Sequence, residues 1–478
     1  MKKIEDSQEG IFSRRNILMG LGLLGINAVL LPLPKVFASG VTKNCTSVEE
    51  LQATIDIANA GDLLTLAPGT YADAEIFIKR SGLTITAQNA GKVIFNGASK
   101  VSIKADSTVF SGFQFIDGDT QGIVIKVSGS KNQLIDLNFS GYSAEKYINI
   151  EAGSQYNDIS FCNFENKPAS APIGNLVGVI PHETIPGFNR IRFCSFKNLP
   201  GPGGDYGNEA IRLGVGAKSD FISRTTVEYC YWENTGLGDS ESISIKCREN
   251  VIRYCTFNNN IDGMLVFRNG NDNMAYGNTF IDSGGIRVKE ASNIFCFNNY
   301  FENSGIGGKA GSVIFDYLPE NLQNINFLFN TFINSAPISL GGKGAVLNSW
   351  SNNLFSNKSG PIFQDPNEGT KWIGNIYQGL LGLKTTSGLK SGAPKFTKKA
   401  NDYYRPAVTS TTRSAAVSGF TLPVMYPGMT PENPLSRDLF RTLRSSKTTS
   451  RDVGAIQYLK IPAKSVLLSS KTTGPRYF

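Results

Sequence analysis

Histidine and charged residues are scarce in this sequence. Its 478 residues include one histidine, His182, and only 18% are charged, whereas glycine occurs 50 times. Few charges and many glycines favour tight turns over long amphipathic helices. His182 stands in Pro181-His182-Glu183, away from the other clustered polar residues, and we expect it to be a surface loop residue. Chemistry that depends on a cluster containing histidine is therefore disfavoured.

Long hydrophobic runs are absent after the first 31 residues, so no later segment is expected to span a bilayer. No signature of nucleic-acid binding accompanies the net charge of +8. After Gln378, sixteen Lys/Arg face four Asp/Glu, which leaves about −4 for the rest of the chain. This basic end could hold an anionic polymer or form a solvated surface. A hydrophobic content of 40% excludes global disorder.

The first 38 residues read as an export signal. The paired arginines of Ser13–Leu18 precede an apolar run from Met19 to Leu31, and Val36-Phe37-Ala38 supplies small residues before a plausible cleavage point. The run is short for a membrane anchor. We therefore expect residues 1–38 to be a signal peptide of the twin-arginine type, or an ordinary secretory signal that carries two arginines. Either signal predicts a periplasmic or secreted protein.

An internal repeat is the strongest organising pattern. Its unit is a small or polar residue, a spacer and an aromatic residue, as in Cys162-Asn163-Phe164 and Asn278-Thr279-Phe280. The aromatic position recurs at intervals of 21 to 36 residues. The ten members are Phe115, Phe139, Phe164, Phe196, Trp232, Phe257, Phe280, Phe301, Phe332 and Phe355.

The repeat predicts an all-β fold, a single-stranded right-handed parallel β-helix. A turn of about 22 residues with three short strands forms one coil, and longer intervals imply loop insertions. Ser47 opens a capping box for a helix through about Ala60, which would cover the N-terminal end of the core. We expect the β-helix to span residues 39–378 and a basic C-terminal extension, 379–478, to pack on or cap it. Asp452–Ile456 is a possible final strand.

Cysteine and asparagine share one position of the repeat. Stacked coils would place these side chains in a ladder about 4.8 Å apart. Asparagines hydrogen-bond along such a ladder, and buried cysteine packs there as a small apolar group. Disulfides between adjacent thiols are the alternative.

Polar and charged residues cluster near the longest insertions. Lys246 and Arg268 are 22 residues apart, one coil, and Arg287 follows after 19, so the three should form a column on one face. Asp239 and Glu241 project to the same side of an extended segment. Lys246 lies five residues beyond Glu241, so a bulge is needed if all of them are to meet.

Such a cluster could act on a uronic acid polymer. Removal of the C5 proton builds negative charge on the sugar carboxylate, which an adjacent cation must neutralise. A neutral lysine can take the proton when neighbouring cations lower its pKa. An asparagine and two carboxylates offer hard oxygen ligands that suit Ca²⁺. The alternative is a set of structural salt bridges on the surface.

Several motifs resemble polysaccharide lyase family six, which includes alginate lyases and chondroitinase B. The likeness covers most of residues 41–380 and rests on Asn208–Gly214, Glu241–Lys246, Asn250, Phe267–Asn271 and Gly284–Val288. The resemblance implies Lys246 as base, Arg268 as acid, Arg212, Asn269 and Arg287 as substrate-binding residues, and Ca²⁺ held by Asn208, Asp239 and Glu241. Two positions depart from the family pattern. Asp239 replaces the usual Glu, and Asn269 replaces a frequent His, which puts substrate contacts and pH behaviour in doubt.

The function expected is Ca²⁺-assisted β-elimination of alginate to unsaturated oligosaccharides, by a monomer whose partner is the anionic polysaccharide. Chondroitin or dermatan sulfate remains an alternative substrate, and a non-catalytic polysaccharide-binding β-helix an alternative role. Pectin hydrolases and uronate C5-epimerases share the scaffold but tend to use histidine, so the isolated His182 counts against both.

Overall fold

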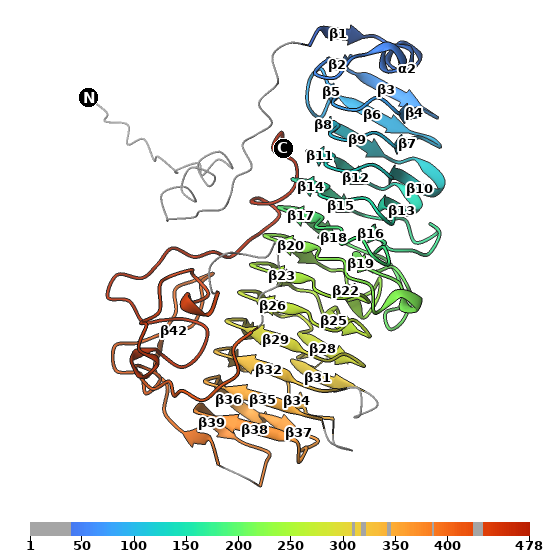
Figure 1. Cartoon of the computed structure of the whole chain (residues 1–478). Coiled ribbons are helices and arrows are strands. Elements are labelled where there is room, and N and C mark those ends of the chain that lie inside the picture. Colours follow the sequence, from blue (N-terminus) through green and yellow to red (C-terminus); the bar gives the residue numbers. More distant parts are fainter. Residues whose placement is uncertain (1–39, 308–310, 317–321, 342–345, 385–386, 424–433) are drawn as a thin grey trace, which may run out of the picture.

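The computed structural model describes residues 40–307, 311–316, 322–341, 346–384, 387–423 and 434–478. The predicted export signal at 1–38 lies outside them. The chain winds into a parallel β-helix in which three long sheets, A, B and C, run the length of the molecule (Figure 1). Most coils contribute one strand to each sheet, and strands of successive coils pair in parallel. The predicted β-helix is confirmed.

Sheet A has fourteen strands. They are β1 Thr42–Cys45, β2 Leu63–Leu66, β5 Thr84–Ala87, β8 Val109–Ser111, β11 Gln133–Ile135, β14 Asp158–Ser160, β17 Arg190–Arg192, β20 Thr226–Glu228, β23 Val251–Arg253, β26 Met274–Tyr276, β29 Ile294–Phe297, β32 Ile325–Leu328, β35 Asn348–Ser351 and β38 Thr370–Ile373.

Sheet B also has fourteen. They are β3 Gly69–Ala72, β6 Val93–Asn96, β9 Phe113–Ile116, β12 Asn138–Ser140, β15 Asn163–Glu165, β18 Ser195–Lys197, β21 Tyr231–Glu233, β24 Thr256–Asn258, β27 Thr279–Ile281, β30 Tyr300–Glu302, β33 Thr331–Ile333, β36 Leu354–Pro361, β39 Asn375–Leu380 and β40 Leu389–Ser391.

Sheet C has twelve. They are β4 Glu75–Ile78, β7 Lys100–Ile103, β10 Asp119–Val127, β13 Ser143–Ile150, β16 Val177–Val179, β19 Ile211–Leu213, β22 Glu241–Ile245, β25 Met264–Arg268, β28 Ile286–Lys289, β31 Val313–Asp316, β34 Ile338–Ser339 and β37 Phe363–Gln364.

The repeated aromatic residues form one ladder inside sheet B. Phe139 pairs in register with Phe164, and Phe280 with Phe301. Along the ladder from Phe115 to Phe355, neighbouring ring centroids lie 4.3–5.3 Å apart. Since every ring stacks on the coil before and the coil after, this ladder fixes the register of the whole β-helix.

The shared position of cysteine and asparagine is a second ladder at the turn into sheet B. Cys162, Cys194, Cys230 and Cys255 occupy consecutive coils as buried free thiols. Asparagines continue it, and Asn330 Nδ2 donates to Asn353 Oδ1 at 3.0 Å. The predicted ladder is confirmed and the disulfide alternative is wrong, because all seven cysteines are free.

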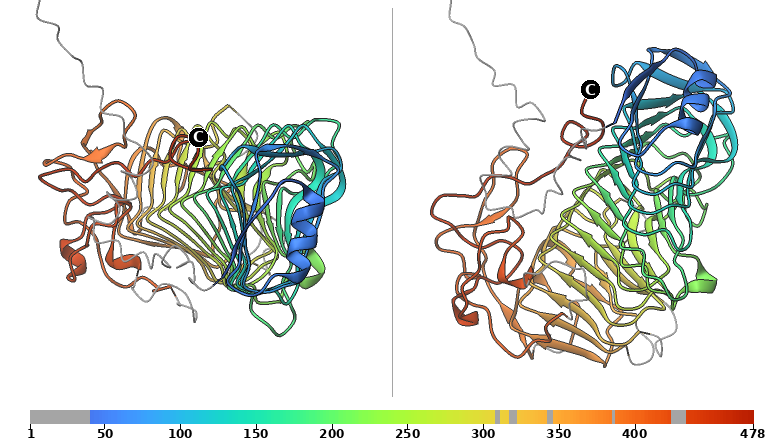
Figure 2. Two further views of the ribbon diagram at one scale, coloured as in Figure 1. Left: turned by 90° about the horizontal axis from the view of Figure 1, so that it is seen from above. Right: turned by 45° about the horizontal axis from the view of Figure 1, so that its top comes forward.

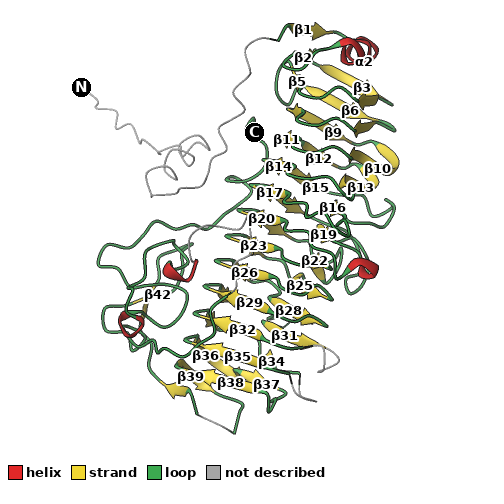
Figure 3. Cartoon of the chain, in the orientation of Figure 1, coloured by secondary structure: helices red, strands yellow, loops and turns green. Residues whose placement is uncertain are grey.

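The N-terminal cap is shorter than predicted. Helix α2 runs over Val48–Ile57, with the Ser47 side chain accepting from the Glu50 N–H. It ends before Ala60 because Ala58 is already extended. Strand β1, which precedes the helix and pairs with β2, was not predicted. In the described residues the other helices are the 3₁₀ turns η1 Gly216–Lys218, η3 Pro434–Ser436 and η4 Thr448–Ser450 (Figure 3).

The C-terminal extension packs along the outside of the β-helix, on the side of sheets A and B (Figure 2). Its two short strands, β41 Phe396–Thr397 and β42 Arg405–Pro406, form an antiparallel pair. Asp452–Ile456 is packed but not a strand, because its N–H groups bond to loops and side chains rather than to a sheet edge. None of the helices described is long and apolar enough to cross a membrane.

Candidate active site

The outward face of sheet C brings the predicted cations together. Strands β22 and β25 pair with Ile245 opposite Phe267, so Lys246 and Arg268 follow directly on neighbouring coils. Arg268 then pairs with Lys289 on β28. A column of cations therefore exists, and its third member is Lys289.

Arg287 is not part of this column, so that detail of the prediction is wrong. It lies opposite Val266, two residues before Lys289, in the row that also contains Arg212 on β19. The interval of 19 residues from Arg268 is shorter than the 21 that separate the true partners. A residue offset of two keeps Arg287 on the same face but places it in the neighbouring row.

The predicted bulge is present on β22. The register between β22 and β25 shifts between Glu241 and Ile243. Glu241 then accepts a hydrogen bond of 2.8 Å from Arg268 Nη1, although the two residues are 27 positions apart. The irregularity brings Glu241, Arg268 and Lys246 to one place, as the spacing of five between Glu241 and Lys246 required.

Lys246 is partly buried and has one long ion pair. Its side chain is 16% exposed, and its Nζ lies 3.9 Å from Glu209 Oε1. Burial lowers the pKa of Lys246, and the nearby charges of Arg212 and Arg268 lower it further, against the opposing effect of Glu209 and Glu241. The amine therefore loses its proton more easily than an ordinary lysine does.

The pKa of Arg268 is shifted in the direction opposite to that of Lys246. Burial disfavours its charge, but the contact with Glu241 outweighs burial and raises the pKa of the guanidinium. The second oxygen of Glu241 accepts from the hydroxyl of Ser244. Arg268 is thus a fixed positive charge beside a lysine that can deprotonate.

The predicted substrate-binding side chains all have acidic partners within the protein. The donor–acceptor pairs are Arg212 Nε to Glu209 Oε1 at 3.0 Å, Arg287 Nε to Asp316 Oδ2 at 2.8 Å, and Asn269 Nδ2 to Glu290 Oε2 at 2.6 Å. Each arginine has five N–H donors, so donors remain for an anionic ligand while these pairs hold the side chains in place.

The predicted calcium ligands are close neighbours, but their oxygens face hydrogen-bond donors. Asn208 Oδ1 accepts from Lys167 Nζ at 3.1 Å and from the Gly174 N–H at 3.0 Å. The two oxygens of Asp239 accept the backbone N–H groups of Gly207 and Glu241.

Glu241, the third predicted ligand, is bound by Arg268 and Ser244. Burial raises the pKa of the Asp239 carboxyl to about 7, and the charges of Glu209 and Glu241 add to this effect. Nowhere in the described part of the chain do three His, Cys, Asp or Glu residues converge as a metal site. This arrangement does not fit a calcium cage, in which six to eight oxygens point at one ion.

Three residues of the cluster were missed from the sequence: Lys167, Glu209 and Lys289. Glu209 is 3% exposed and lies between Arg212 and Lys246. Its signal was present, because it adjoins Asn208 in the motif used above. Lys167 lies in an insertion between β15 and β16, and no spacing rule connects it to sheet C.

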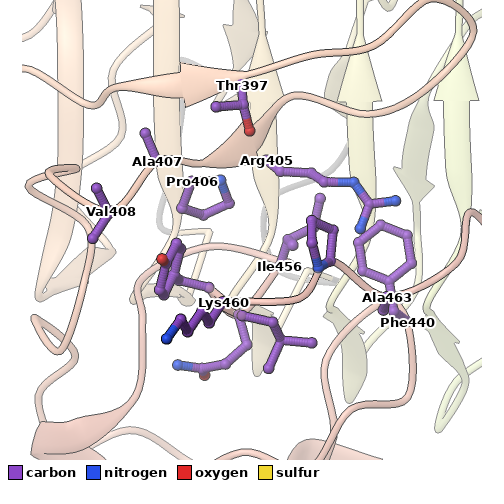
Figure 4. Close-up of a pocket in the computed structure, with 13 residues that line it drawn as sticks. Thr397, Arg405, Pro406, Ala407, Val408, Phe440, Ile456, Lys460 and Ala463 are labelled. Atoms are coloured by element: carbon purple, nitrogen blue, oxygen red, sulfur yellow. The ribbon is translucent and has the colours of Figure 1, made fainter.

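A cavity of about 290 Å³ lies elsewhere, in the C-terminal extension (Figure 4). Thr397, Phe440 and Lys460 are among the residues that line it. Arg405 also lines it, with its guanidinium 4.1 Å from the centroid of the Phe440 ring. The lining contains none of the predicted site residues, so this cavity is separate from the cluster on sheet C.

The fold and the site are thus a parallel β-helix that carries a partly buried lysine and an arginine on adjacent coils of sheet C. A sequence profile of the chondroitinase B family matches residues 45–342, more than half of the chain. The chain belongs to this family, which is polysaccharide lyase family six. No curated protein sequence matches it.

Solved structures agree on the fold. The PL6 family alginate lyase AlyGC superposes with a TM-score of 0.70 at 24% identity, covering 77% of this chain and 56% of AlyGC. A mannuronic acid-specific family 6 lyase from human gut microbiota gives 0.61 at 21%, over 73% of this chain and 90% of that one. The lyase Pedsa3628 from Pseudopedobacter saltans gives 0.59 at 23%, over 73% and 94%. This chain thus spans little more than half the length of AlyGC.

Proposed function

We propose that this protein is a polysaccharide lyase that cleaves a uronic-acid polymer, preferentially alginate, by β-elimination. The observation that carries the proposal is Lys246, a partly buried amine with a lowered pKa, one coil from the fixed charge of Arg268. Family membership supports the same chemistry.

The reaction follows from the charges of Lys246 and Arg268. Neutral Lys246 takes the C5 proton of a uronic acid residue, and the C–H electron pair stays on C5 as a carbanion that the adjacent carboxyl group stabilises. That pair then forms the C4–C5 double bond as the C4–O bond breaks. The leaving oxygen gains a proton, from Arg268 or from water. Protonated Arg268 stabilises the developing negative charge until the leaving oxygen is protonated, and where Arg268 supplies that proton it regains one from water.

Calcium at Asn208, Asp239 and Glu241 remains a prediction of the family resemblance. When bound there, it would act as a Lewis acid on the substrate carboxylate. The oxygens of these three residues already accept hydrogen bonds within the protein. The reaction steps given above therefore use only Lys246 and Arg268.

Alginate is preferred over a glycosaminoglycan because AlyGC is described as an alginate lyase and the gut enzyme as mannuronic acid specific. Chondroitin or dermatan sulfate is the second candidate, because the matching profile is that of chondroitinase B. A non-catalytic binding role is less well supported, since binding requires cations but not a lysine whose pKa is lowered. Export to the periplasm or outside the cell, and a monomeric state, complete the proposal.

The test is incubation of the purified chain with alginate, polymannuronate, polyguluronate and chondroitin sulfates, following the ultraviolet absorbance of the unsaturated product. We expect turnover of at least one uronan and a loss of about a thousandfold in Lys246→Met, the range for removal of a proton-transfer group. Lys197→Met, which removes an ion pair with Glu165 on sheet B, is the matched control and should retain activity. Full activity in Lys246→Met would disprove the mechanism.

A further inference from the structure

Lys167 is a buried cation that the mechanism does not use. Its residue is 3% exposed, and its Nζ contacts three oxygens. It donates to Gly174 O at 3.0 Å, Asn208 Oδ1 at 3.1 Å and Glu145 O at 3.4 Å. An ammonium has three N–H donors, so all of them are accounted for. This enclosed ammonium is therefore in direct contact with Asn208, one of the predicted metal ligands.

The amide oxygen of Asn208 has no capacity left for a metal ion. It has two lone pairs, and Lys167 and the Gly174 N–H take them. A divalent ion at this oxygen would lie next to the ammonium, and two cations a few ångströms apart repel strongly in a buried site. Either the ion or the ammonium can occupy the position, and in this structure the ammonium does.

The charge of the cluster is also satisfied without a metal. Its buried carboxylates are Glu209, Asp239 and Glu241. Opposing them are four basic groups, Lys167, Arg212, Lys246 and Arg268, each within electrostatic range of at least one of these acids. When Lys246 acts as the neutral base, the three remaining cations are at least as many as the negative charges on the three carboxylates. A further charge of +2 would leave an excess in a buried region.

We propose that the ammonium of Lys167 is the cation at Asn208, in the place that the family resemblance gives to calcium, and that the reaction therefore needs no divalent metal. Lys167 acts through Asn208 and Glu209 and is a positioning residue rather than a catalytic one. The part of the inference that concerns activity rests on the proposed lyase function. The part that concerns calcium binding does not.

Calorimetric titration of the full chain with Ca²⁺ after chelator treatment tests the proposal first. We expect no stoichiometric binding tighter than about 1 mM, the weak limit for protein calcium sites. Lys167→Met should gain a single Ca²⁺ site, with a calcium-dependent rise in Tm, because the substitution frees Asn208 Oδ1 and removes the repelling charge. Lys197→Met, the control used above, should gain none.

Activity gives the second measurement. Chelator should leave the rate of the native chain within about twofold, and Lys167→Met should lose about tenfold, less than a direct oxyanion contact is worth. Millimolar Ca²⁺ should restore part of that loss, an effect that a merely structural role for Lys167 would not produce.

One tightly bound Ca²⁺ in the native chain, with loss of activity on its removal, would overturn the proposal. That result requires no variant, so it stands even if Lys167→Met fails to fold. If no uronan is cleaved, the proposed function fails, while the calcium titration of the native chain still decides the role of Lys167.

Discussion

At the scale of single residues, the reactivity of Lys246 is the outcome of opposing charges. Burial and the cations Arg212 and Arg268 lower its pKa, whereas Glu209 and Glu241 raise it. Glu241 is already committed to Arg268 at 2.8 Å. Glu209 is therefore the acidic neighbour through which the pKa of Lys246 is set.

The first prediction concerns Glu209→Gln. Loss of the carboxylate removes a charge that stabilises protonated Lys246, so the pKa of the amine should fall further. Because the neutral amine is the base, activity rises as pH increases through this pKa. The rising limb of kcat/KM against pH should accordingly move to lower pH in the variant.

The comparison for this profile is Glu233→Gln on β21 of sheet B, a half-buried glutamate away from the cluster. Its pH profile should match that of the native chain. A rising limb in Glu209→Gln that is unmoved, or moved to higher pH, would show that Lys246 is not the group that titrates.

Sequence reasoning found Lys246 and Arg268 because residues one coil apart become neighbours whatever loops intervene. It failed for Lys167, which reaches the cluster from an insertion 41 residues before Asn208. Loop conformation decides such a contact, and no periodicity encodes it. Glu209 was overlooked although it adjoins Asn208 in the sequence, because spacing alone does not show that its carboxylate meets Arg212 and Lys246.

At the scale of elements, the asparagine ladder holds successive coils together. Asn330 Nδ2 donates to Asn353 Oδ1 at 3.0 Å and to Cys296 O at 2.9 Å, and its Oδ1 accepts the Asn299 N–H at 2.9 Å. Asn330 is fully buried. The side chain therefore satisfies backbone groups of the neighbouring coils that water cannot reach.

The second prediction is that Asn330→Ala lowers the free energy of unfolding by about 3 kcal/mol, because it leaves several buried polar groups without partners. Asn258→Ala on β24 removes one half-exposed contact, to Tyr231 Oη at 3.3 Å. It should cost less than about 1 kcal/mol. Denaturant unfolding of both variants measures the difference, and equal losses would contradict a special role for the ladder.

Element boundaries were predictable where the chemistry is local. Ser47 starts α2 because its side chain caps the Glu50 N–H, a contact within four residues. The bulge at Glu241 followed from alternation alone. Asp452–Ile456 was a possible final strand, but it forms no strand and packs on Thr331 and other side chains of the β-helix. Its conformation depends on that distant surface.

At the scale of the whole molecule, the C-terminal extension runs back along the β-helix and ends beside its N-terminal half (Figure 1). Arg476 donates to both oxygens of Asp136, at 2.6 Å to Oδ2 and 3.1 Å to Oδ1. Its guanidinium also lies 4.6 Å from the centroid of the Phe161 ring. The last residues thus tie the final segment to the loops between β11 and β15, 340 positions earlier.

This tie leads to the last prediction. Arg476→Ala removes a bidentate pair and a cation–π contact, together worth about 1–2 kcal/mol for a partly exposed site. Because this tail is a short terminal segment outside the three sheets, the loss should appear as local opening rather than global unfolding. Proteolysis within residues 469–478 should accelerate about tenfold, since 1.4 kcal/mol is tenfold in the open population.

Arg413→Ala, which removes a cation–π contact with Tyr458 inside the extension, should leave cleavage of the tail unchanged. Equal cleavage rates in Arg476→Ala and the native chain would mean that other contacts hold the tail, such as the Gly474 N–H bond to Phe193 O and the packing of Tyr477 against Gly91.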